Sequence, residues 1–98
     1  MAQIIENWAR LCGEVTNVRP STDRARWVVI ELAVDTITDV AGHRNLLRDQ
    51  YGSTAVEVQA RVASTAGVRS GVRVCCRAAR RTPTLIIAHP DHLEVEAA

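Results

Sequence analysis

The residues of this chain that could do chemistry are mainly arginines and a few aromatic rings. All twelve basic residues among the 98 are arginine, and the only aromatic residues are Trp8, Trp27 and Tyr51. Exclusive use of arginine can reflect genome composition, but a guanidinium also forks onto phosphates and stacks on planar rings better than an ammonium does. Indole rings offer a flat apolar surface for stacking. These residue types predict a binding surface for planar, anionic ligands.

The arginines are concentrated in two segments. Residues 67–84 contain five arginines and no acid, and residues 10–26 contain four arginines against two acids. Residues 31–59 hold five acids against Arg44 and Arg48, so the formal net charge of the chain is only +1. A polyanion would therefore be attracted along particular loops and not over the whole surface.

Catalytic and metal-binding motifs are not evident. His43, His89 and His92 do not have the spacing of a zinc site, and Pro90 disfavours a helix that would bring His89 and His92 together. The sequence has no glycine-rich phosphate loop, nucleophile elbow or paired-acid motif. We expect a protein that is not an enzyme and uses no metal and no cofactor.

The three cysteines do not predict a disulfide framework. Cys75 and Cys76 are adjacent, and neighbouring residues of a strand point to opposite faces. Cys76 is expected to be buried, and neither thiol has an evident activator in the sequence. We expect reduced thiols with no functional role.

Alternating apolar and polar residues predict the strands that position these groups. This period-two pattern is typical of a strand with one buried face. The expected strands are residues 8–18, 26–37, 54–62, 72–79 and 84–88, with a further extended segment at 93–95. Turns are expected at 19–23 and 80–83, and residues 39–53 form a long connection that extends a hairpin or contains a helical turn.

Five such strands predict an all-β fold, namely one five-stranded OB-fold barrel over residues 1–98 with an extended connection between strands two and three. Gly13 would permit the first strand to bend, and the chain leaves room for at most one short helix. An SH3-like or other small barrel is the competing arrangement.

Several segments resemble bacterial single-stranded-DNA-binding proteins (SSB) and the primosomal replication protein PriB. Residues 7–15 resemble the first strand of that family, in which an asparagine-led strand carries Leu-x-Gly-x-Val. Residues 68–74 are similar to the start of its fourth strand, residues 85–95 to its last strand, and residues 41–44 lie where the family extends a hairpin. The resemblance implies an OB-fold, binding of single-stranded DNA in replication, repair or restart, and contact with other replication proteins.

Parity along the strands predicts where the rings point. If Leu11 and Val15 face inward, Trp8 and Arg10 face outward, and Trp27 is outward on the second strand by the same argument. Both tryptophans would then lie on the outer face of the first two strands, where stacking contributes on the order of 1–3 kcal/mol per base. The expected nucleic-acid-binding residues are Trp8, Arg10, Arg24, Arg26, Trp27, Arg44, Arg73, Arg77, Arg80 and Arg81.

Alternatives to this interpretation stay open. Each tryptophan could cap the barrel or fill a subunit interface, and Arg80 and Arg81 could form a solvated turn. Glu31 and Glu57 on the outward face would repel phosphate. These features favour a second hypothesis, an OB-like protein-protein interaction module that does not bind nucleic acid.

Assembly and location follow from the apolar content. Trp8 or the edge of the first strand needs to be covered, which predicts a homodimer or higher homo-oligomer. The sequence has no apolar run of membrane-spanning length and no basic segment followed by a long apolar one near its start. We therefore expect a cytoplasmic protein with no membrane partner.

Overall fold

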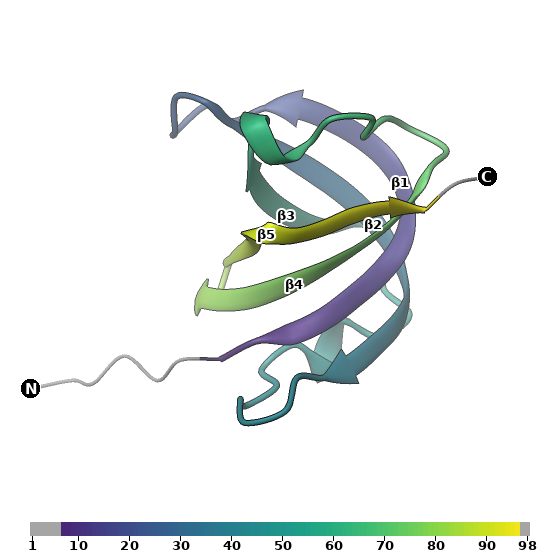
Figure 1. Cartoon of the computed structure of the whole chain (residues 1–98), viewed down its shortest axis with the longest axis vertical. Helices are drawn as coiled ribbons and strands as arrows, with labels where there is room; N and C mark the ends of the chain where they lie inside the picture. The colour runs from purple at the N-terminus through teal and green to yellow at the C-terminus, as the bar shows by residue number, and fades with distance from the viewer. Residues whose placement is uncertain (1–6, 97–98) are drawn as a thin grey trace, which may run out of the picture.

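Five strands close into a barrel in the computed structural model, which describes residues 7–96 (Figure 1). The strand order around the ring is β1-β2-β3-β5-β4, and β3 and β5 are parallel while the other neighbours are antiparallel. The strands are β1 (Ala9–Pro20), β2 (Trp27–Asp39), β3 (Val56–Arg61), β4 (Arg73–Thr82) and β5 (Leu85–Glu96), and the short 3-10 helices are η1 (Arg48–Gln50) and η2 (Val62–Ser64). The predictions of an all-β chain and of five strands are confirmed.

The alternating pattern fills the barrel as expected. In β3, Val56, Val58 and Ala60 are buried, while Glu57 and Arg61 between and after them are exposed. The other strands also contribute inward side chains, and the connection between β2 and β3 adds Leu47. The largest fully buried side chains are those of Leu11, Ile30, Leu32, Leu47, Val15, Val58 and Val74. Since an outward residue on each strand lies between two inward ones, the core fixes which side chains the barrel presents to a ligand.

The backbones of β1 and β2 approach each other closely at Gly13. The β1–β2 register shifts between Cys12 and Gly13, and a Cβ at Gly13 would clash with the carbonyl oxygen of Ala33 on β2. The close approach of the two backbones requires glycine here.

Strand boundaries differ from the prediction at the β4–β5 hairpin. Arg80 and Arg81 belong to β4, and the turn that was expected at 80–83 contains only Pro83 and Thr84 between the two strands. β5 also continues through His89 to Glu96 and does not stop at Ala88. The β4–β5 ladder contains a bulge within this longer strand. Cys76 pairs with Leu93 and Ala78 pairs with Ala88, so Arg77 on β4 lies opposite the four residues 89–92 on β5.

The edge of β1 is covered within the chain. β1 pairs with β2 from Ala9 to Pro20 and with β4 from Ala9 to Glu14. Closing the ring thus covers this edge within the chain over residues 9–14, and there it needs no second subunit. No helix in residues 7–96 is long and apolar enough to cross a membrane.

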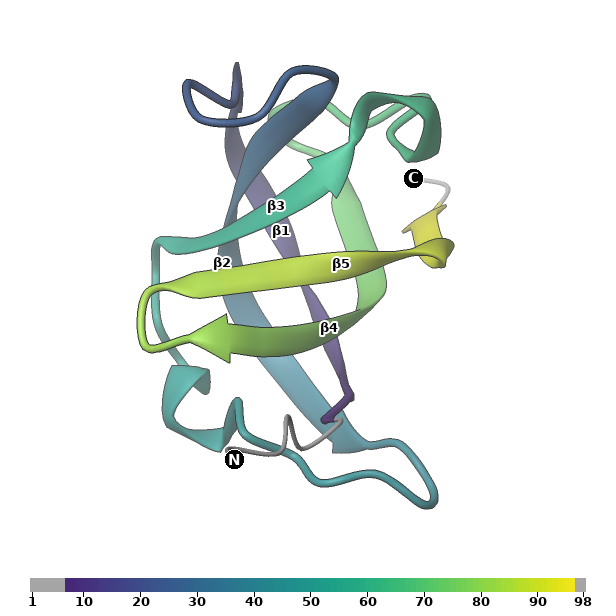
Figure 2. The ribbon, with the colours of Figure 1, turned by 90° about the vertical axis from the view of Figure 1, so that its left-hand side faces the viewer.

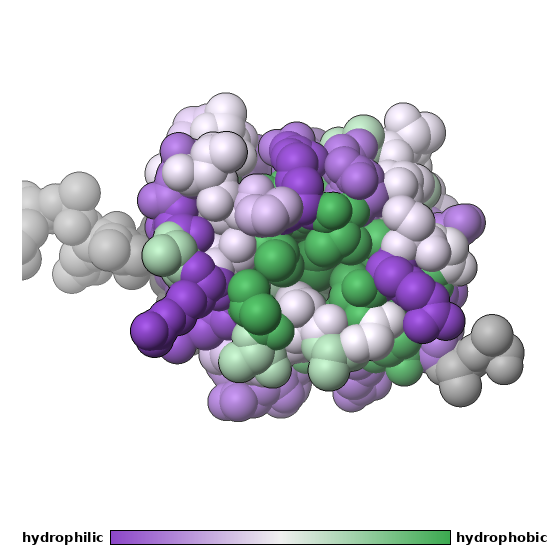
Figure 3. All heavy atoms as spheres, turned by 90° about the horizontal axis from the view of Figure 1, so that it is seen from above, coloured by the Kyte–Doolittle hydropathy of each residue, from purple (hydrophilic) through white to green (hydrophobic). Residues whose placement is uncertain are grey.

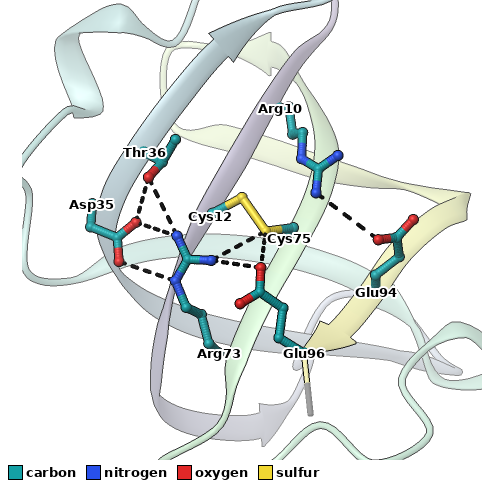
Figure 4. The surroundings of a disulfide bond; sticks show 8 residues. All are labelled: Arg10, Cys12, Asp35, Thr36, Arg73, Cys75, Glu94 and Glu96. Carbon is teal, nitrogen blue, oxygen red and sulfur yellow. Dashed lines mark hydrogen bonds and ion pairs between the residues drawn. A yellow bond between two sulfur atoms is a disulfide. The ribbon is translucent and has the colours of Figure 1, made fainter. Parts of the chain in front are cut away.

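Cys12 and Cys75 form a disulfide, which corrects the expectation of three reduced thiols (Figure 4). They are direct partners in the β1–β4 ladder, with Cα atoms 4.1 Å apart and a sequence separation of 63. The prediction was based on Cys75 and Cys76, which are adjacent in sequence and whose side chains point to opposite faces of β4. Cys76 is free and buried, as expected, and burial raises its pKa to about 12.

Candidate nucleic-acid interface

Trp27 is partly exposed at the start of β2, and two arginines lie against its ring. The guanidinium carbon of Arg24 is 5.0 Å from the ring centroid, and that of Arg61 is 5.6 Å from it. Both distances are within the range of a cation–π contact. We call Arg24, Arg26, Trp27 and Arg61 the Trp27 cluster.

Two elements position this cluster. Arg61 is the direct partner of Trp27 in the β2–β3 ladder. Arg24 and Arg26 lie in the loop after β1, where the Ser21 hydroxyl accepts hydrogen bonds from the backbone N–H groups of Asp23 and Arg24. The carbonyl of Arg26, a residue with a left-handed φ of 67°, accepts a hydrogen bond from the N–H of Val62. The N–H of Ser21 donates to the carbonyl of Trp27, so the loop is tied to both β2 and η2.

The charge of the Trp27 cluster is not neutralised by neighbouring acids. Among residues 7–96, Arg24, Arg26 and Arg61 form no ion pair with a carboxylate. All three are exposed. Beside them lies a pocket of about 580 Å³ lined by Ala25, Arg26, Trp27, Arg61, Val62 and Ala63. An anion that carries a flat ring could use both the charge and the indole.

The acids of the outward β2–β3 face are paired. Arg19 forms ion pairs with Glu31 at 3.1 Å and with Glu57 at 2.6 Å. The hydrogen bond to Glu57, and the nearby charge of Glu57 and Glu31, hold the pKa of Arg19 above its ordinary value. One arginine thus offsets part of the repulsion that these two acids would exert on a phosphate.

Trp8 lies in a second group of rings. The centroids of Trp8 and His89 are 5.0 Å apart, those of His89 and His92 are 4.7 Å apart, and both pairs are edge-to-face. The Arg81 guanidinium carbon is 5.5 Å from the Trp8 centroid. We call Trp8, Arg81, His89 and His92 the Trp8 cluster.

The two tryptophans are at opposite ends of the β1–β2 hairpin. Trp8 precedes Ala9, which pairs with Asp39 at the end of β2, whereas Trp27 begins β2 near Pro20. The two rings are therefore not neighbours on the outer face of the first two strands. The hairpin is twelve residues long on β1, so a shared outward parity does not bring its two ends together.

Several expected binding arginines are held in ion pairs. Arg73 pairs with Asp35 and Glu96, both at 2.7 Å, over the disulfide, and Arg10 lies 4.0 Å from Glu94 (Figure 4). The guanidinium groups of Arg10 and Arg73 are therefore bound to carboxylates on the outer face of the barrel itself.

Arg80 also has internal partners. Its guanidinium lies 3.0 Å from Asp49, and its backbone N–H and C=O bond the side-chain amide of Asn7 at 2.9 and 3.0 Å. Arg80 thus connects β4 to η1 and to the residue before Trp8.

The remaining expected residues, Arg44 and Arg77, lie on the Trp8 side of the barrel. The carbonyl of Arg44 accepts a hydrogen bond from the Trp8 N–H, and its side chain is exposed. Arg77 lines a pocket with Arg10, His92 and Glu94. Neither arginine pairs with an acid among residues 7–96.

Sequence reasoning missed Arg61 and both histidines as members of these clusters. Outward parity in β3 could have identified Arg61, since Val56, Val58 and Ala60 alternate with it, but its partner Trp27 depends on the β2–β3 register. His89 reaches Trp8 only because the strands between them are closed into the ring.

No family model, curated protein or solved structure matches this chain. The two clusters are therefore the features of this chain that bear on its function.

Proposed function

We propose that this chain is a non-enzymatic single-stranded-DNA-binding protein with an OB-fold, acting in replication, repair or restart as SSB and PriB proteins do. The observation that carries the proposal is the partly exposed Trp27 ring beside Arg24 and Arg61. Single-stranded nucleic acid is held by aromatic rings under the bases and positive groups along the backbone. OB-folds commonly bind through the face of strands two and three and the loop between strands one and two, which is where the Trp27 cluster lies.

A labelled poly-dT oligomer, titrated with the protein at two salt concentrations, tests this proposal. We expect binding that weakens with salt, because phosphate contacts release counterions. The variant Trp27→Ala should weaken binding and leave the salt slope nearly unchanged, since stacking releases no counterions. If the protein does not bind the oligomer even at low salt, the proposal is wrong.

A protein-protein interaction module is the second candidate function. Figure 3 shows the face at the top of Figure 1, where apolar residues gather at the centre and hydrophilic residues surround them. The exposed large apolar residues of the described chain include Val62, with 52% of its surface accessible, and Val95, with 36%. A protein-interaction module predicts no salt-dependent binding of an oligonucleotide, whereas the DNA-binding proposal predicts a steep dependence.

We further propose a homodimer, with other replication proteins as additional partners, located in the cytoplasm. Light scattering at micromolar concentration tests the dimer, and a monomer mass would contradict it. The Cys12–Cys75 disulfide makes the location testable as well, because most cytosolic proteins keep their thiols reduced. Trapping the thiols in intact cells should show Cys12 and Cys75 largely reduced in the cytoplasm, and full oxidation would contradict that location.

A further inference from the structure

The Trp8 cluster is assembled from three separate parts of the chain. Trp8 immediately precedes β1, Arg81 is near the end of β4, and His89 and His92 belong to the bulge of β5. Three rings follow one another at 5.0 and 4.7 Å, and a guanidinium lies 5.5 Å from the first of them. The combination of flat rings and a cation is the same as in the Trp27 cluster.

Two hydrogen bonds hold the bulge in place, one within it and one to η2. The imidazole Nδ1 of His89 accepts a hydrogen bond from the backbone N–H of Asp91 at 3.1 Å, which leaves Nε2–H as a donor. The hydroxyl of Ser64 in η2 donates to the carbonyl of Pro90 at 3.0 Å. Bulges re-aim side chains at binding sites, and this one turns His89 toward Trp8.

Charges around the rings suit a phosphate backbone. Arg81 is exposed, and neither it nor Arg77 pairs with an acid among the described residues. The acids nearby on β5 are Asp91 and Glu94, and Arg10 lies 4.0 Å from Glu94.

A short path connects the two clusters across the β3–β5 side of the ring. Gln59 of β3 pairs in parallel with Ile87 of β5, and two residues further along these strands are Arg61 and His89. η2 follows Arg61 directly and is bonded to Pro90. Figure 2 shows β3, β5 and β4 side by side on this face.

We propose that the Trp8 cluster is a second base-stacking site for the same DNA single strand, which runs from Trp27 past η2 and the β5 bulge to Trp8. The inference rests on the proposed function and adds the path of the strand. A short oligomer occupies one cluster, and a longer one occupies both. Site sizes of roughly 4–16 nucleotides per OB-fold make dT4 and dT16 suitable probes.

The test compares the full-length protein with the double variant Arg81→Gln/His89→Gln on both oligomers. Comparing the proteins on each oligomer cancels the larger number of binding registers on dT16. We expect the variant to weaken dT16 binding at least fivefold and dT4 binding less than twofold. The matched control, Arg48→Gln/His43→Gln, removes the same residue types from the β2–β3 connection and should change neither affinity by more than twofold.

A second measurement does not depend on loss of affinity. In Trp27→Phe, Trp8 is the only tryptophan, and we expect dT16 to quench its fluorescence more strongly than dT4 does at equal saturation. Unchanged dT16 affinity in the double variant, or equal quenching by the two oligomers, would overturn the second site while leaving the proposed function standing. If the unmodified protein binds neither oligomer, the proposed function and this inference fail together.

Discussion

Arg61 and Trp27 face each other directly across the β2–β3 ladder, with the guanidinium carbon 5.6 Å from the ring centroid. An exposed contact of this kind contributes about 0.5–1 kcal/mol, enough to orient the arginine but not to fix it. Arg24 contacts the same ring from a loop. A base that stacks on Trp27 can therefore displace a guanidinium at low cost, and the displaced arginine is then close enough to pair with the adjoining phosphate.

Replacing Arg61 with Ala should weaken oligonucleotide binding and make it less dependent on salt. Each phosphate contact that is lost removes about 0.7 from the single-strand salt slope. The slope is measured by titrating labelled poly-dT from low to physiological salt. The control Arg48→Ala removes the same charge from an arginine that pairs with Asp39 and lies outside both clusters. Equal slopes for Arg61→Ala and the unmodified protein would exclude Arg61 from the interface.

The sequence predicted the local features of this site better than its long-range ones. Alternation identified all five strands and the outward direction of Trp27, because burial of one face depends only on neighbouring residues. The Cys12–Cys75 bond and the contact between Trp8 and His89 depend on how distant strands pair in the ring. Polar residues near Pro83 suggested an early turn, whereas Arg80 is in fact kept in β4 by its pairing with β5.

Asn7 should be required for stability. Its side chain is only 3% exposed, and it bonds both the N–H and the C=O of Arg80. Asn7→Ala leaves these two backbone groups without that partner, which costs about 1–3 kcal/mol. Urea unfolding followed by circular dichroism measures the loss. The control is Asn17→Ala, an exposed residue of the same type on β1, which should change the free energy of unfolding by less than about 0.5 kcal/mol.

The oxidised protein should contain one free thiol that is unreactive until the chain unfolds. Only the thiolate reacts with a disulfide reagent, and Cys76 is buried with its pKa raised to about 12. A thiol titration should give no reactive group in the native protein and one after denaturation. All three should react after denaturation with reductant. Three reactive thiols without reductant would show that the bond between Cys12 and Cys75 had not formed.

Removing the disulfide should lower the free energy of unfolding without removing the fold. The bond closes a loop between residues 63 apart in sequence, and a disulfide of this kind typically contributes about 2–4 kcal/mol. We expect Cys12→Ser/Cys75→Ser to show this loss in urea and to keep the circular dichroism of the oxidised protein. The control is the unmodified protein with reductant, which should unfold at a similar urea concentration.

The ion pair between Asp35 and Arg73 should make stability depend on acid pH. The hydrogen bond from Arg73, with a smaller one from Thr36, holds the pKa of Asp35 below its ordinary value of 3.8. Since the folded state binds this proton less readily than the unfolded state does, the pair stabilises the protein above pH 3.8. That contribution is lost as the pH falls through the lowered pKa. The Asp35 side chain is 54% exposed, so solvent screening limits the effect to less than about 1 kcal/mol.

Asp35→Asn tests this dependence. The variant should be less stable than the unmodified protein in urea at pH 7 and pH 5. The difference should shrink as the pH falls from 3.8 through the lowered pKa, because the unfolded state takes up this proton more readily than the folded state does. The control Asp23→Asn removes an exposed carboxylate that has no arginine partner among the described residues. Its effect on stability should be small at neutral pH. A difference for Asp35→Asn that stays constant down to pH 2.5 would mean that the carboxylate charge is not what Arg73 stabilises.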